Sequence, residues 1–131
     1  MTNAMPIFIN SLFPYLAKAS LDSSAKKFIE AARKSIAIAE KEMNYADIAF
    51  AHAGTDSESP NLKLAEIARW HCEQSIKHYG EAVTAFDQAA KLTLPAKYKK
   101  YIDLKSKKCL EEMAYANTRK IKFALVLRTA N

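Results

Sequence analysis

The chain has 131 residues, with 20 Lys and Arg against 14 Asp and Glu, and it contains two Gly, four Pro and two Cys. A chain of this length can form one domain that buries about two thirds of its unfolded surface, without a metal or disulfides. The few Gly and Pro exclude folds built on tight turns, and the longest apolar run, 123–127, is far short of the roughly 20 residues of a membrane span. We therefore predict one soluble, all-α domain covering residues 1–131.

The first segment, residues 6–20, is amphipathic and is interrupted by Pro14. We expect a short helix, or two turns, that covers one end or one groove of the domain. Its apolar block, residues 5–17, has no positive charge before it and is broken by two prolines, so we do not expect a signal peptide. We predict a cytoplasmic protein.

Three long helices follow, at about 22–53, 61–93 and 96–128. In the first two, small and apolar residues recur at alternating steps of three and four, which keeps one seam of a helix facing a partner. The first seam is Ile29, Ala32, Ile36, Ala39, Met43, Ala46, Phe50 and Ala53, and the central seam is Ala65, Ala68, Cys72, Ser75, Tyr79, Ala82, Phe86 and Ala89.

The helix ends carry the expected signals. Asp22, Ser23 and Ser24 are good N-cap residues for the first long helix, Gly54 suits its C-terminal end, and Pro60 suits the first turn of the central helix. Helices of about 45 Å joined by such short connections fold back on one another as an up-down-up bundle. Three Ala-rich helices make a slender core, so we expect the N-terminal segment or a second copy of the chain to complete it.

One part of the central helix carries a family resemblance. Residues 79–92 resemble the second helix of a tetratricopeptide repeat, through Tyr79, Ala82, Phe86 and Ala89. The preceding helix departs from that family's pattern, because Trp70 stands where a small residue is needed. The same hairpin is also similar to the helical repeats of BRO-type endosomal-sorting adaptors and to microtubule-interacting-and-transport domains. The resemblance implies protein-protein recognition by a helical scaffold, with no catalytic residues.

A tetratricopeptide repeat would require the chain to turn at 77–81. The unbroken seam favours a continuous helix there instead.

Few residues are candidates for catalysis or metal binding. His71, Cys72 and His78 are types that bind metals, but Cys72 points about 100° away from His71 on a helix. We interpret the histidines as ordinary surface residues and predict no metal and no cofactor. The chain has no nucleophile elbow, phosphate-binding Gly loop or paired-cysteine zinc motif, so we predict that it is not an enzyme.

The two cysteines, Cys72 and Cys109, both fall on seam positions. We interpret them as buried, reduced side chains, and a bridge between them stays open if their helices are neighbours.

The last helix carries the basic charge of the chain. Residues 95–131 hold ten Lys and Arg against three acids, a local charge of +7, which leaves residues 1–94 at −1. At 100° per residue its core face is Tyr98, Ile102, Cys109, Met113, Ala116, Phe123, Ala124 and Leu127. Nearly opposite lie basic residues with apolar ones among them: Lys97, Lys100, Leu104, Lys108, Tyr115, Arg119, Lys122 and Val126.

These eight residues form the predicted binding surface. Lysines at the start of a helix oppose its macrodipole by about 0.3 to 1 kcal/mol each, a placement that an anionic partner would explain and stability does not. We predict a non-catalytic interaction module that binds an acidic protein partner. Binding of nucleic acid or an anionic membrane surface, a structural homodimer, and a face that is only solvated stay open as alternatives.

Overall fold

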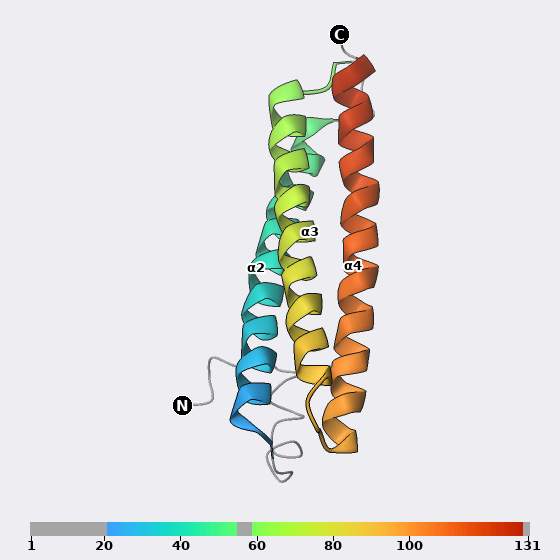
Figure 1. Ribbon diagram of the computed structural model, residues 1–131. Helices are drawn as coiled ribbons and strands as arrows, with labels where there is room; N and C mark the ends of the chain where they lie inside the picture. Colours follow the sequence, from blue (N-terminus) through green and yellow to red (C-terminus); the bar gives the residue numbers. More distant parts are fainter. Residues whose placement is uncertain (1–20, 55–58, 130–131) are drawn as a thin grey trace.

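The computed structural model describes residues 21–54 and 59–129. Within them the chain forms three α-helices, α2 (Ser23–Ala53), α3 (Leu62–Ala90) and α4 (Ala96–Thr129), and no strand. The helices run alternately up and down, and α3 packs along both of its neighbours (Figure 1). The prediction of an all-α bundle with three long helices is confirmed. The short helix expected at 6–20 lies outside the described residues.

The polar ends of the helices follow capping chemistry. The Asp22 carboxylate accepts a hydrogen bond from the Ser24 N–H at 2.7 Å, and Asn61 accepts one from the Leu64 N–H at 3.1 Å. Gly54 ends α2 in the left-handed conformation, with φ 63° and ψ 47°, which a Gly adopts at little cost. Pro60 precedes the cap Asn61, so it lies outside α3 and not in its first turn.

The helix α3 ends at Ala90, earlier than the predicted 93. The N–H of Leu92 bonds to the carbonyl of Ala89 at 3.1 Å, a tight turn that closes the helix. The early end has a packing reason, because it lets Leu94 turn into the core. Between its ends α3 is continuous, and the helix runs through 77–81 as the seam favours.

The seam of α3 is buried at every predicted position, from Ala65 to Ala89. In α2 the buried residues are five alanines spaced seven residues apart, together with Met43 and Ala49. Ile29, Ile36 and Phe50 are half-buried instead of fully buried. All three pack against buried residues of the core, and Phe50 also meets Phe123 of α4. The five regularly spaced alanines are Ala25, Ala32, Ala39, Ala46 and Ala53.

A hydrogen bond between helices marks the close approach of α2 and α3. The Ser75 hydroxyl, which is fully buried, donates to the Ala39 carbonyl at 3.0 Å. A side chain as short as Ser reaches a neighbouring helix backbone only where both helices carry small residues. The Ala and Ser seams therefore set the spacing of this pair.

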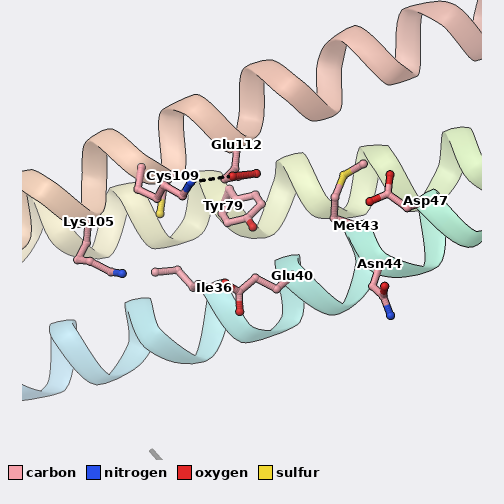
Figure 2. Close-up of a pocket in the computed structure, with 10 residues that line it drawn as sticks. Ile36, Glu40, Met43, Asn44, Asp47, Tyr79, Lys105, Cys109 and Glu112 are labelled. Carbon is pink, nitrogen blue, oxygen red and sulfur yellow. Dashed lines mark ion pairs between the residues drawn. The ribbon is translucent and has the colours of Figure 1, made fainter. Parts of the chain in front are cut away.

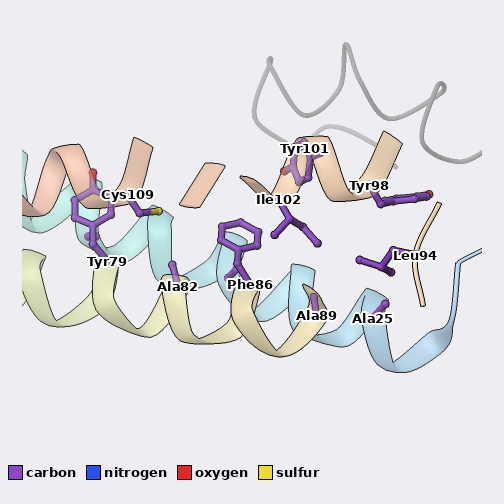
Figure 3. Packing of buried hydrophobic residues seen from close by; sticks show 12 residues of the cluster. Ala25, Tyr79, Ala82, Phe86, Ala89, Leu94, Tyr98, Tyr101, Ile102 and Cys109 are labelled. Atoms are coloured by element: carbon purple, nitrogen blue, oxygen red, sulfur yellow. The ribbon is translucent and has the colours of Figure 1, made fainter. Parts of the chain in front are cut away.

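The core consists of two clusters of buried residues. One lies at the turn between α3 and α4 and is centred on Phe86, whose ring meets Tyr101 edge to face at 6.4 Å (Figure 3). The other lies towards the opposite end of the bundle, where Phe50 and Phe123 meet edge to face at 5.0 Å. Both buried clusters span more than one helix, so they hold the three helices together.

Each cluster holds one cysteine. Cys109 belongs to the first and Cys72 to the second, and both are buried and unbridged. The bridge that the sequence left open is therefore not formed in this structure. The core face predicted for α4 is buried or half-buried throughout, and Tyr101, which the prediction omitted, is buried beside it.

None of the helices among the described residues is long and apolar enough to cross a lipid bilayer.

Candidate functional site

A groove runs between α2 and α4, and α3 lies beneath it. Its volume is about 480 Å³, and Tyr79 of α3 lies at its floor beside Cys109 of α4 (Figure 2). Both of these side chains are almost fully buried. The other lining residues are Ile36, Glu40, Met43, Asn44 and Asp47 from α2 and Lys105, Lys108 and Glu112 from α4.

The rim of the groove carries charges of both signs. Lys108 and Glu112, one turn apart on α4, form an ion pair at 3.2 Å. At the end of the groove nearest the C-terminus of α4, Arg119 of α4 forms an ion pair with Asp47 of α2 at 3.4 Å and so connects the two helices. The floor, in contrast, is apolar. The groove therefore suits an apolar segment that is bordered by polar or charged groups.

Burial changes the acid-base behaviour of the groove residues. Loss of hydration raises the pKa of the Cys109 thiol to about 11, with Lys105 acting in the opposite direction. Burial also lowers the pKa of Lys105 and raises that of Tyr79. Cys109 is accordingly a protonated thiol at neutral pH, and a thiol is a poor nucleophile.

The predicted face of α4 borders this groove. Leu104 is 65% exposed, more than any other large apolar residue among the described residues, and Tyr115 is 43% exposed. The lysines of the predicted set are also exposed, namely Lys97, Lys100, Lys108 and Lys122. An exposed leucine and tyrosine thus lie among lysines on the outer edge of α4.

Several residues of the predicted set make contacts within the chain, among them Lys108, Arg119, Lys122 and Val126. Arg119 donates hydrogen bonds from Nε and Nη2 to the Tyr115 hydroxyl at 2.9 and 2.7 Å. Its guanidinium also lies 3.9 Å from the centre of the Phe50 ring, in a cation–π contact with α2. Val126 is half-buried and packs against the second core cluster. This end of the predicted face therefore supports the bundle, while the Leu104 end is open to solvent.

A second exposed apolar patch was missed by the sequence reasoning. It lies across α2 and α3 and contains Tyr45, Ile48, Ile67 and Trp70, each between 42% and 52% exposed. His71 joins the two helices there, because its ring contacts both Tyr45 and Trp70. The signal was available in the sequence, since Trp70 does not fall on the buried seam.

Both histidines of α3 have carboxylate partners. His71 Nδ1 lies 2.5 Å from Glu42 of α2, and His78 Nδ1 lies 2.8 Å from Glu81. Glu81 follows His78 by three residues, a spacing that places both side chains on one face of α3. In the part of the chain that the structure describes, no three His, Cys, Asp or Glu side chains gather in a way that could hold a metal ion.

Comparison of the chain with protein-family models, with curated proteins and with solved structures gives no match.

Proposed function

We propose that the chain is a non-catalytic helical module that binds an acidic protein partner through the exposed face of α4. The contact residues are Leu104 and Tyr115, and the lysines around them select the acidic partner. Part of the proposal is that the short N-terminal helix completes the bundle and that the protein acts in the cytoplasm, where both thiols stay reduced.

The exposure of Leu104 carries this proposal. A leucine that is 65% exposed gains nothing for the stability of the chain, and Tyr115 lies three turns along the same edge. Exposed aromatic and aliphatic side chains bordered by charge are typical of protein interfaces.

The first test compares two leucines of the same helix. Leu104 and Leu110 are both more than half exposed, at 65% and 53%, but they point about 120° apart around the axis of α4. We expect Leu104→Ala to lower the capture of a partner from host extract about tenfold or more, and Leu110→Ala to leave it unchanged. Tyr115→Ala should act like Leu104→Ala and should keep the helical circular dichroism signal.

The second arm of the test reverses charge. Lys97→Glu with Lys100→Glu should abolish capture, while Lys63→Glu with Lys77→Glu on α3 makes the same change in net charge elsewhere and should not. Equal capture by all variants would contradict the proposal. Capture that disappears after nuclease treatment would replace the protein partner with nucleic acid.

A further inference from the structure

The groove between α2 and α4 has an apolar floor that only three helices enclose. Tyr79, Cys109, Ile36 and Met43 all line it, yet α2 and α4 stand too far apart along this stretch for their backbones to pack closely. In a four-helix bundle, a further element fills such a space between two helices. The groove therefore lacks a partner in the described part of the chain.

The chain itself contains a segment that needs such a site. Residues 2–17 hold no charged side chain, and between residues 5 and 17 they are rich in large apolar ones. Burying each large apolar side chain stabilises a fold by about 1.5 to 3 kcal/mol relative to leaving it in water. These side chains are Met5, Ile7, Phe8, Ile9, Leu12, Phe13, Tyr15 and Leu16.

The segment has the length to reach the groove. The described chain starts at Leu21, which packs against the first core cluster next to the start of α2. Along α2 the groove extends from about 20 Å to about 36 Å beyond Ser23, at 1.5 Å per residue. The chain from Met5 to Leu21 spans about 24 Å as a helix and about 53 Å when extended. A fully helical chain brings only Met5 to the lower end of the groove, whereas an extended chain brings the middle of residues 5–17 level with it.

We propose that residues 5–17 of the same chain occupy the groove between α2 and α4. Their apolar side chains cover Tyr79 and Cys109, and the charged rim of Glu40, Lys105 and Glu112 remains at the water boundary. This inference rests on the part of the proposed function in which the N-terminal segment completes the bundle, and it is independent of partner binding by α4. It names the surface that the N-terminal segment covers.

Cross-linking through Cys109 tests the proposal in the full chain. In a Cys72→Ala background, single cysteines are introduced as Phe8→Cys, Leu12→Cys or Phe13→Cys and treated with a short bismaleimide. Ser20→Cys is the control, because it adjoins Leu21, about 20 Å below the groove. We expect at least one of the three positions to link to Cys109 within the chain about tenfold more than the control does. Peptide mass spectrometry identifies the link.

Two results would overturn the proposal. One is a yield at all three positions that does not exceed that of Ser20→Cys. The other is cross-linking only between two chains at low protein concentration, which would make a second copy the occupant of the groove.

A second measurement uses the natural thiols as reporters. Phe8→Glu with Leu12→Glu should release the segment and raise the rate of Cys109 alkylation about tenfold, with Cys72 unchanged. Thr2→Glu with Asn3→Glu adds the same charge outside the segment and should change neither rate. An unchanged Cys109 rate in the first variant contradicts the proposal. If both thiols react faster, the whole bundle has loosened and the cross-linking result decides.

Discussion

At the scale of single residues, Ser75 shows how a polar side chain can hold two helices close. Its hydroxyl is fully buried and donates to the Ala39 carbonyl across the α2/α3 contact. The Ala39 carbonyl accepts this bond in addition to the backbone hydrogen bond of its own helix. The short side chain lets the two helices approach closely. Small size and hydrogen bonding therefore act together at this position.

Two substitutions separate these contributions. Ser75→Ala removes the hydrogen bond but keeps the space, so we expect a loss of about 1 kcal/mol in the free energy of unfolding. Ser75→Leu adds volume between two alanine seams, and we expect a loss of about 1 to 3 kcal/mol or more. Urea denaturation followed by circular dichroism measures both. A leucine variant as stable as the alanine variant would show that the seam is loosely packed.

The periodicity of small and apolar residues predicted much of the core, but it did not predict which residues contact a neighbouring helix. The seam of α3 was correct at each position because small residues at steps of three and four leave only one buried face. Tyr101 was missed, and Arg119 and Val126 were assigned to an outer face although they contact α2 or its cluster. Periodicity gives the direction of a side chain around its own helix, while these contacts depend on where the next helix lies.

At the scale of elements, α4 differs from the other helices in its charges. Its first turn holds no acidic residue and contains Lys97 and Lys99, which face the positive end of the helix dipole. The groove beside α4 also could not be predicted, because the sequence does not state that α2 and α4 stay apart. Only the contacts of α3 with both helices reveal it.

A single substitution tests the energetic cost of these lysines. Lys99 is exposed and lies outside the proposed binding set, so Lys99→Glu should raise the free energy of unfolding by about 0.3 to 1 kcal/mol. Lys107→Glu, in the middle of the same helix, is the control and should change stability less. Thermal denaturation at low salt is the measurement, since salt screens the effect. A less stable Lys99→Glu variant would mean that the dipole does not govern this end of α4.

At the scale of the whole molecule, each of the two core clusters contains a thiol whose pKa is raised. Burial raises the pKa of both Cys72 and Cys109 from 9.0 to about 11. Between these values the unfolded chain loses thiol protons that the folded chain keeps, so folding becomes less favourable as the pH rises. Burial also raises the pKa of Tyr101 to about 12, which continues the trend at higher pH.

The stability of the protein should therefore fall in alkaline solution. Below pH 9 the thiols have no effect on the pH dependence, and between pH 9 and 11 each lowers the free energy of unfolding by about 1.4 kcal/mol per pH unit. Urea denaturation at a series of pH values gives the slope. The Cys72→Ala, Cys109→Ala double variant should be less stable at neutral pH but flatter between pH 9 and 11. An equal slope in both proteins would contradict this account.

The odd number of long helices has a mechanical consequence. Because α2, α3 and α4 alternate in direction, the start of α2 and the end of α4 lie at opposite ends of the bundle (Figure 1). At 1.5 Å per residue these points are about 45 to 50 Å apart. A two- or four-helix hairpin would bring them together. The bundle thus holds Ser23 and Thr129 apart as a stiff rod does.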